Sequence, residues 1–255
     1  MTPTPFVAAV VLPMFNEADN VLPVFERLAA VQAVGMFGLR AIAVDDGSRD
    51  ATWERIQQAA QPFVRAVRHP INRGMAAAIR TGISTALAER NPVVDAIACM
   101  DSDLTHAPED LPTLLAPIAN GRADFVLGSR YVRGGGMVGV PWERRAISIG
   151  GNAVGRLLLG VPAADLTSGF RAARSDVYRA VELTEPGFGI QLEGTVKAHR
   201  AGFRVAEVPI TLGVRRHGYS KMAYTRAFWL SYGRLFVGLM LSRGRHPSTL
   251  RRPVV

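Results

Sequence analysis

Three clusters of acidic side chains each follow an apolar run of the sequence. They are Asn16-Glu17, Asp45-Asp46 and Asp101-Ser102-Asp103. If the runs are neighbouring parallel strands, their carboxyl ends meet at one edge of a sheet, which is where ligands bind. Carboxylates gathered there repel one another unless a cation or a donor-rich ligand is present. Turn formation or helix capping explains each cluster singly, but three clusters at strand ends favour a ligand site.

The Asp101-x-Asp103 pair predicts the kind of ligand. Residues i and i+2 of an extended or turning segment can aim two oxygens at one hard cation, while diphosphate oxygens complete the octahedron. The pair directly follows the apolar run that ends at Met100, which favours a functional role. The sequence has neither a G-x-x-x-x-G-K-[ST] loop nor a G-x-G-x-x-G turn after a strand. A P-loop NTPase and a Rossmann dehydrogenase are therefore disfavoured.

The elements that must position these side chains alternate along the first 130 residues. Short runs rich in Val and Ile predict buried strands, and the segments between them predict amphipathic helices. This alternation indicates an α/β fold with a mostly parallel sheet flanked by helices. The expected strands are Phe6–Leu12, Leu39–Val44, Val64–Val67, Val93–Met100 and Asp124–Leu127, and the expected helices are Glu17–Val31, Thr52–Ala60, Met75–Glu89 and Pro108–Ile118.

Beyond residue 130 the pattern changes. The segment Arg133–Gly136 predicts that 131–141 form a flexible loop, because three consecutive glycines do not continue a strand or a helix. Further elements are then expected at Trp142–Leu159, Ser175–Leu183 and Ile190–Arg200 as helices, and at Thr167–Ala172 and Val205–Leu212 as strands. The absence of an internal repeat or a low-complexity linker favours one domain.

The net charge of the chain lies at its C-terminal end. There are 30 basic and 21 acidic residues in 255, a formal charge of +9, and residues 208–255 contain nine basic residues and no acid. Positions 1–207 are therefore balanced. A basic block of this kind favours anionic partners, namely nucleic acid, anionic lipid or phosphorylated substrates. A single cysteine, Cys99, excludes a disulfide scaffold and fits a reducing compartment.

The C-terminal segment predicts an amphipathic helix. The apolar run Ala227–Leu241 is interrupted by Arg234 and is shorter than the roughly 20 residues of a spanning helix. No targeting segment is evident at the start of the chain, so an integral membrane protein is not expected. Binding to a bilayer surface and packing on the core explain the apolar stripe equally well. Its members are Phe228, Trp229, Tyr232, Leu235, Phe236, Leu239 and Met240.

Ordered motifs cover most of the chain. They are Val11–Glu17, Val44–Thr52, Asn72–Gly74, Met100–His106, Gly128–Tyr131, Arg144–Ser148, Asp165–Arg171, Phe188–Gln191, Glu207–Pro209 and Arg215–Lys221. In this order they resemble the family 2 GT-A glycosyltransferases, and within them the dolichol- or polyprenol-phosphate mannosyltransferases. The resemblance implies a Rossmann-like GT-A domain over 1–225. Residues 226–255 would form a basic amphipathic segment at the membrane interface.

On the donor side, the resemblance implies a nucleoside pocket, a metal site and a diphosphate site. The nucleoside pocket would be lined by Pro13, Phe15, Glu17, Val44 and Asp46. The family usually has tyrosine where this chain has Phe15, so ring stacking is kept and any hydroxyl contact is lost. Asp101 and Asp103 would be the catalytic residues that hold Mg²⁺ or Mn²⁺, with Thr105 as a weaker neutral ligand and Ser102 beside the diphosphate. Arg215 and Lys221 match residues that reach the donor diphosphate.

On the acceptor side, the resemblance implies that Arg130, Arg144 and Ser148 bind a phosphate. The planar guanidinium of arginine binds phosphate oxygens in a bidentate manner. Arg144 and Ser148 lie four residues apart, on one face of the expected helix, so both can address one anion. The alternatives are that Arg130 pairs with neighbouring acids and that Arg144 is an exposed helix charge.

These assignments imply an inverting, metal-dependent transfer of mannose from GDP-mannose to a polyprenyl or dolichyl monophosphate. The acceptor phosphate is already anionic, so no catalytic base is assigned. The enzyme would lie peripherally at the cytoplasmic face of an anionic membrane, with or without a separate membrane-spanning partner, and no nucleic acid is expected to bind. Three alternatives stay open: transfer of another sugar such as glucose from UDP-glucose, a non-enzymatic basic protein that binds nucleic acid or membrane, and an inactive scaffold for a membrane partner.

Overall fold

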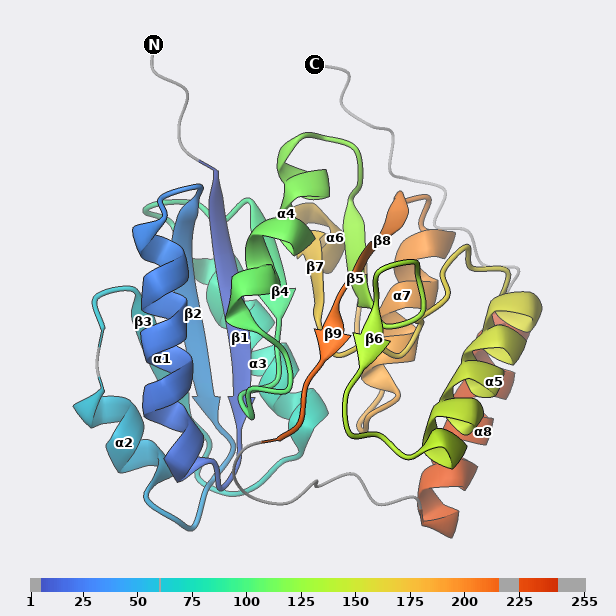
Figure 1. Cartoon of the computed structure of the whole chain (residues 1–255), viewed down its shortest axis with the longest axis horizontal. Coiled ribbons are helices and arrows are strands. Elements are labelled where there is room, and N and C mark those ends of the chain that lie inside the picture. Colours follow the sequence, from blue (N-terminus) through green and yellow to red (C-terminus); the bar gives the residue numbers. More distant parts are fainter. Residues whose placement is uncertain (1–5, 60, 216–224, 243–255) are drawn as a thin grey trace.

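A computed structural model describes residues 6–59, 61–215 and 225–242. A seven-stranded sheet lies at the centre, with helices on both faces (Figure 1). The strands are β1 (Val7–Met14), β2 (Gly38–Asp45), β3 (Val64–Arg68), β4 (Ala96–Cys99), β5 (Phe125–Ser129), β7 (Arg171–Arg174) and β8 (Val205–Pro209). The α-helices are α1 (Ala18–Ala33), α2 (Thr52–Gln58), α3 (Met75–Ala88), α4 (Leu111–Ala119), α5 (Trp142–Leu159), α6 (Ser175–Ala180), α7 (Ile190–Arg200) and α8 (Arg226–Leu241).

The order of the strands brings the predicted acidic clusters together. The order is β3-β2-β1-β4-β7-β5-β8, and every neighbouring pair is parallel except the two that involve β7. In this register Met14 of β1 lies beside Asp45 of β2, and Val11 lies beside Cys99 of β4. The carboxyl ends of β1, β2 and β4 therefore meet at one edge. The expected α/β fold with a mostly parallel sheet is confirmed.

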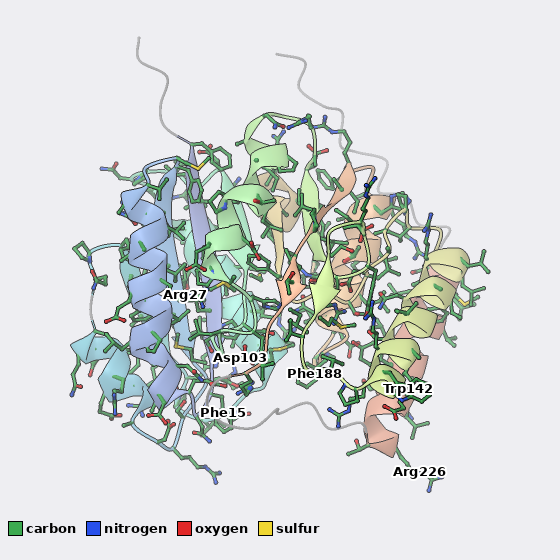
Figure 2. All side chains as sticks on the ribbon, viewed as in Figure 1. Phe15, Arg27, Asp103, Trp142, Phe188 and Arg226 are labelled. Carbon is green, nitrogen blue, oxygen red and sulfur yellow. The ribbon has the colours of Figure 1, made fainter. Side chains whose placement is uncertain are left out.

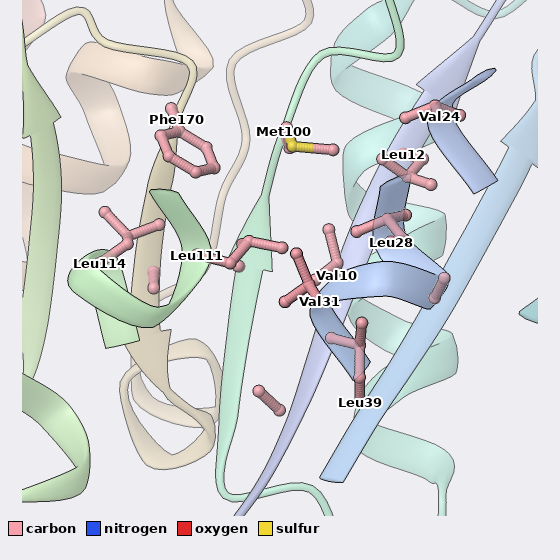
Figure 3. Packing of buried hydrophobic residues seen from close by; sticks show 14 of the residues in the cluster. Val10, Leu12, Val24, Leu28, Val31, Leu39, Met100, Leu111, Leu114 and Phe170 are labelled. Atoms are coloured by element: carbon pink, nitrogen blue, oxygen red, sulfur yellow. The ribbon is translucent and has the colours of Figure 1, made fainter. Parts of the chain in front are cut away.

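The core lies on both faces of the sheet. Along β1, Val10 and Leu12 face α1 and α4 (Figure 3), whereas the alternate residues Ala9 and Val11 face α3. Burial on both faces explains why these strands are continuous apolar runs. Burial of each aliphatic side chain contributes about 1.5–3 kcal/mol to the stability of the fold. The sheet is therefore well stabilised beneath the edge that carries the acidic clusters. The side chains that α1 buries recur at helical spacing: Val21, Val24, Phe25, Leu28 and Val31.

Several expectations about the second half of the chain are wrong in detail. The strand expected at Thr167–Ala172 begins only at Arg171, and the helix expected at Ser175–Leu183 ends at Ala180. The 131–141 segment is not loop throughout, because Gly136–Met137 forms a short strand, β6, parallel to β9 (Thr211–Leu212). The expected strand Val205–Leu212 is divided into β8 and β9. The division falls at Ile210, whose N–H bonds to Ser129 of β5 while its carbonyl accepts from Gly136. Residues 205–212 thus pair first with β5 of the main sheet and then with β6 of the 131–141 segment.

The apolar stripe of the C-terminal helix packs on the core. Leu239 is buried, and Tyr232, Leu235 and Phe236 are partly buried against the cluster beneath α7. The side chains of Phe228 and Trp229 lie outside the described residues. Helices α5 and α8 pack together at one edge of the molecule (Figure 1, right). Within the part of the chain that the structure describes, no helix has both the length and the apolar character needed to cross a bilayer.

Candidate active site

The site lies at the edge where β1, β2 and β4 end. Figure 2 shows Phe15 and Asp103 at this lower edge of the sheet. The chain turns sharply after β1 and after β4, and in each turn a residue other than glycine has a positive φ angle, 51° at Asn16 and 62° at Leu104. Such backbone strain collects at functional sites. The two turns lie on neighbouring strands and flank the same edge.

Asp46 fixes one wall of the site. Its buried carboxylate lies 2.6 Å from Nδ1 of His69 and accepts backbone N–H bonds from Arg73 and Gly74, at 2.9 and 2.8 Å. At Gly47, where φ is +68°, a Cβ would collide with the backbone of Ile71. The loop after β2 is therefore pressed against the Asn72–Gly74 motif. In this arrangement the carboxylate of Asp46 positions the wall of the predicted nucleoside pocket.

His69 was not predicted as a site residue. It is 4% exposed, and its Nε2 lies 2.9 Å from the Thr81 hydroxyl of α3. The signal that could have found it is its place three residues before the Asn72–Gly74 motif, at the end of β3. Val44 also differs from simple expectation, because its side chain is buried in the cluster beneath α3. At 0% exposure, neither the side chain nor the backbone of Val44 reaches a surface that could line a pocket.

Glu17 lies at the start of α1 and is buried. Its Oε2 accepts from Asn20 Nδ2 at 2.6 Å, and its backbone N–H bonds to the Thr52 hydroxyl at 2.8 Å. Its Oε1 accepts from Nη1 of Arg215 at 3.0 Å. Arg215 is 198 residues away in the sequence and reaches this carboxylate across the edge of the sheet. The guanidinium of Arg215 therefore lies at the predicted nucleoside pocket.

The Asp101-Ser102-Asp103 motif presents two different carboxylates. The Asp101 side chain is 41% exposed and lies 3.8 Å from Nδ1 of His106. Asp103 is 9% exposed, and its Oδ2 pairs with Nη2 of Arg215 at 2.7 Å. Ser102 donates to the carbonyl of Pro13 at 2.9 Å, which ties the motif to the end of β1. The structure thus brings together five of the residues assigned to the donor side, namely Pro13, Glu17, Ser102, Asp103 and Arg215.

Thr105 supports Asp103. Its backbone N–H and its hydroxyl both donate to Oδ1 of Asp103, at 3.0 and 2.6 Å. A hydroxyl that donates to a carboxylate still has lone pairs for a cation. In the structure, its hydrogen bonds hold the Asp103 carboxylate in place.

The pKa of Asp101 is raised above its ordinary value. Partial removal of the carboxylate from water is the largest cause, and the charges of Asp103 and Glu17 add to it, against the opposing effects of His106 and Arg215. The ring of His106 stacks on Phe170, with centroids 5.2 Å apart. Crowding of negative charge of this kind favours the binding of a cation.

The donor set fits Mg²⁺ or Mn²⁺. Asp101 and Asp103 offer carboxylate oxygens, and Thr105 adds a hydroxyl, all of them ligands that hard divalent cations prefer. Among the residues described, no group of three or more His, Cys, Asp or Glu side chains forms a metal site. A metal held by these two aspartates would therefore complete its coordination with diphosphate oxygens and water. Lys221 lies outside the described residues.

A second polar cluster lies next to this edge. The guanidinium of Arg130, just after β5, binds the fully buried Asp165 in a bidentate manner through Nε and Nη2, both at 2.7 Å. It also lies over the ring of Tyr131, 5.1 Å from the centroid. The Tyr131 hydroxyl bonds to Ser148 of α5 at 2.6 Å. Arg130 and Ser148 are therefore brought together, and the alternative pairing of Arg130 with an acid is also present.

The residues that support this second cluster were not predicted. Glu207 of β8 accepts the backbone N–H groups of Ala164 and Asp165, at 2.7 and 2.9 Å. Asn152 of α5 accepts from Leu166 and donates to the Ser148 carbonyl. Arg144 lies one turn before Ser148 and is exposed. Asp165 and Glu207 lie in motifs that the sequence shows, but their roles depend on contacts between distant segments.

Comparison with known proteins gives concordant matches. The model of the family described as Glycosyl transferase family 2 matches residues 9–181. A dolichol-phosphate mannosyltransferase of Pyrococcus furiosus is 36% identical over 84% of the chain, which spans 58% of the length of that protein. An undecaprenyl-phosphate mannosyltransferase of Micrococcus luteus is 37% identical, with 84% of the chain and 86% of the relative covered.

The solved structures show the same fold. Glucosyl-3-phosphoglycerate synthase from Mycobacterium tuberculosis, in complex with Mg²⁺ and UDP, superposes with a TM-score of 0.66 and 22% identity, covering 96% of the chain and 81% of the synthase. At this identity the likeness concerns the fold alone.

Proposed function

Because the chain belongs to glycosyl transferase family 2, we propose that it transfers mannose from GDP-mannose to a polyprenyl monophosphate, with inversion at the anomeric carbon. The observation that carries the proposal is the pairing of two neighbouring sites on one sheet edge. One holds the carboxylates of Glu17, Asp101 and Asp103, and the other holds Arg130 and Ser148. The relatives from Pyrococcus and Micrococcus are named for mannose transfer to dolichol phosphate and undecaprenyl phosphate.

On the donor side, Asp101 and Asp103 would hold Mg²⁺ or Mn²⁺, which stabilises the negative charge that develops on a departing nucleoside diphosphate. Arg215 is placed beside both carboxylate positions, at Glu17 and Asp103, and Lys221 follows in the same motif. Phe15 would stack on the base. Ser102, held by the Pro13 carbonyl, keeps the metal motif against the nucleoside pocket.

On the acceptor side, the chain needs to position a nucleophile rather than to activate it. A phosphate monoester oxygen is anionic at neutral pH, so it attacks without losing a proton to a base. Arg130, Arg144 and Ser148 would orient this phosphate toward the anomeric carbon. The network through Tyr131 and Asn152 fixes Ser148 relative to Arg130.

The choice of donor is tested by competition. With a polyprenyl phosphate and Mn²⁺, transfer from radiolabelled GDP-mannose is expected to exceed transfer from UDP-glucose by about a hundredfold, because base and sugar are both recognised by polar contacts. Faster transfer from UDP-glucose would overturn the mannose assignment and favour the alternative sugar. Salt-sensitive oligonucleotide binding without transfer of either sugar would favour the non-enzymatic alternative.

The membrane surface is proposed to lie over α5 and α8. Trp142 of α5, and Leu230, Val237 and Leu241 of α8, are between 55% and 81% exposed. Trp142 lies at the α5 end of the molecule in Figure 2. The exposed Arg226 and Arg234 of α8 accompany these apolar side chains. Apolar residues bordered by arginines are typical of a helix at the surface of an anionic bilayer, and the cytoplasmic face is proposed because it carries such lipids.

The membrane proposal is tested by substitution rather than truncation, since Leu239 of α8 is buried in the core. Changing Leu230, Val237 and Leu241 together to Glu is expected to weaken flotation with anionic vesicles by about tenfold or more. The matched control changes Leu22, Val34 and Met36 to Glu, which are 46–69% exposed elsewhere on the molecule. Undiminished flotation of the α8 variant would contradict this placement.

A further inference from the structure

We propose that the guanidinium of Arg215 takes the place of the metal cation in the unliganded site, so that the metal binds well only together with the donor nucleotide. The inference rests on the proposed function in one respect, namely that Asp101 and Asp103 hold the metal. It concerns the free enzyme and the order in which its ligands bind. It needs neither an acceptor nor sugar transfer for its test.

The geometry of Arg215 is that of a bridging cation. Nη1 lies 3.0 Å from Glu17 Oε1 and Nη2 lies 2.7 Å from Asp103 Oδ2, so one guanidinium joins carboxylates from the ends of β1 and β4. Two other arginines of the described chain behave differently. Arg130 and Arg204 each direct Nε and Nη2 at a single aspartate, and Arg174, which also meets two aspartates, is 47% exposed. Arg215 therefore serves two separate carboxylates, as a metal ion does.

The backbone brings Arg215 to this position independently of its charge. The N–H of Gly213 bonds to the Thr105 carbonyl at 2.8 Å. This bond lies two residues from Arg215 in the segment after β9 and two residues from Asp103 in the turn after β4. Thr105 in turn holds Oδ1 of Asp103. The side chain of Arg215 can therefore leave Asp103 without moving the segment that carries it.

The contact with Arg215 engages one of the two proposed metal ligands, Asp103, and does not involve the other, Asp101. Oδ2 of Asp103 is engaged by Arg215, whereas Asp101, 41% exposed, lies 3.8 Å from His106. A divalent cation that arrives alone must displace a guanidinium from a carboxylate that is 9% exposed. When the metal arrives with a nucleoside diphosphate, the displaced guanidinium gains a new anion, since phosphate oxygens bind arginine well. The exchange thus couples metal binding to nucleotide binding.

The test measures Mn²⁺ binding to the full-length protein by electron paramagnetic resonance, first without nucleotide and then with GDP. Arg215→Gln is expected to bind Mn²⁺ alone about tenfold or more tightly than the wild type, because a competing partly buried ion pair is removed. Arg215→Lys, which keeps the charge but cannot bridge two carboxylates, is expected to lie between them. GDP is expected to raise Mn²⁺ affinity by a larger factor in the wild type than in Arg215→Gln.

The control is Arg68→Gln. The Nε of Arg68 lies 3.1 Å from Oδ2 of the buried Asp45 at the same sheet edge, so this change removes a guanidinium that is paired with Asp45 and not with Asp103. Its Mn²⁺ affinity is expected to stay within about twofold of the wild type, as for a partly exposed pair. Equal or weaker Mn²⁺ binding by Arg215→Gln, with an unchanged melting temperature, would overturn the inference. A change in Arg68→Gln as large as that in Arg215→Gln would also overturn it, because the effect would then be one of net charge. If neither the wild type nor Arg215→Gln bound Mn²⁺ with GDP, the metal site itself would be refuted.

Discussion

Asp103→Ala is expected to lower the rate of the proposed mannose transfer by about a thousandfold or more, because it removes a proposed metal ligand and with it the stabilisation of the leaving diphosphate. The side chain of Asp103 is held by more contacts in the structure than the side chain of Asp101. Asp103 is 9% exposed, is held by Thr105 through Oδ1 and pairs with Arg215 through Oδ2. No neighbouring carboxylate can take its place without breaking these contacts. Initial rates over a range of Mn²⁺ concentrations measure the loss.

Asp103→Asn separates the chemical role of this side chain from its structural one. The amide keeps an oxygen that can accept from Thr105, so the turn after β4 is expected to persist while metal binding fails. Asp176→Ala is the control, since it removes an exposed carboxylate that pairs with Arg174 and Arg179 just after β7, at the opposite edge of the sheet. Near-normal turnover in Asp103→Ala, at any metal concentration, would refute the assignment of Asp103 to the metal.

The position of this aspartate is predictable because the information is local. Alternating apolar and amphipathic segments locate β4 to within a few residues, and Asp101 and Asp103 follow it directly. The carboxyl ends of parallel strands share an edge whatever the loops do. Glu17 and Asp46 come from the same argument. The carboxylates of the donor side therefore follow from where the parallel strands end, whereas Arg215 and Lys221 do not.

The direction of β7 is a different matter. A buried strand shows the same pattern read in either direction, so Thr167–Ala172 gave no sign that β7 runs antiparallel to β4 and β5. This reversal has a consequence for the site, because it brings the Asp165–Gly169 segment to the carboxyl edge. A Cβ on Gly169 would lie 3.4 Å from Oδ2 of Asp101. The acceptor side thus depends on a feature that periodicity does not contain.

Ion pairs between residues far apart in the sequence could not be predicted from the sequence either. Arg215 belongs to the basic block that gives the chain its charge of +9, and a count by segment places it among residues that attract external anions. In the structure it binds Glu17 and Asp103 of the same chain. Arg130, in the electrically balanced part of the sequence, binds Asp165. Net charge describes what a surface attracts, whereas the partner of a particular arginine is set by the fold.

Arg130→Lys is expected to lower transfer to the polyprenyl phosphate by about a hundredfold, which is a loss of about 2.7 kcal/mol of transition-state stabilisation. Asp165 accepts from Nε and Nη2 of Arg130, which are two of the three nitrogens that carry the five N–H donors of a guanidinium. A lysine ammonium can neutralise the buried Asp165, but it cannot bind this carboxylate and a phosphate in the same fixed plane. The loss is therefore expected in the reaction with acceptor, while binding of Mn²⁺ and GDP stays unchanged.

Arg204→Lys provides a closely matched control for this change. Arg204 binds Asp124 through the same two atoms, Nε and Nη2, both at 2.9 Å, away from the predicted site. If an arginine fork on an aspartate were important only for stability, both variants would lower the melting temperature and neither would change the Michaelis constant for the acceptor. A selective loss in Arg130→Lys assigns the arginine to the acceptor phosphate. Near-normal transfer in Arg130→Lys would instead leave Arg130 as the partner of Asp165, and Arg144 and Ser148 would have to bind the phosphate without it.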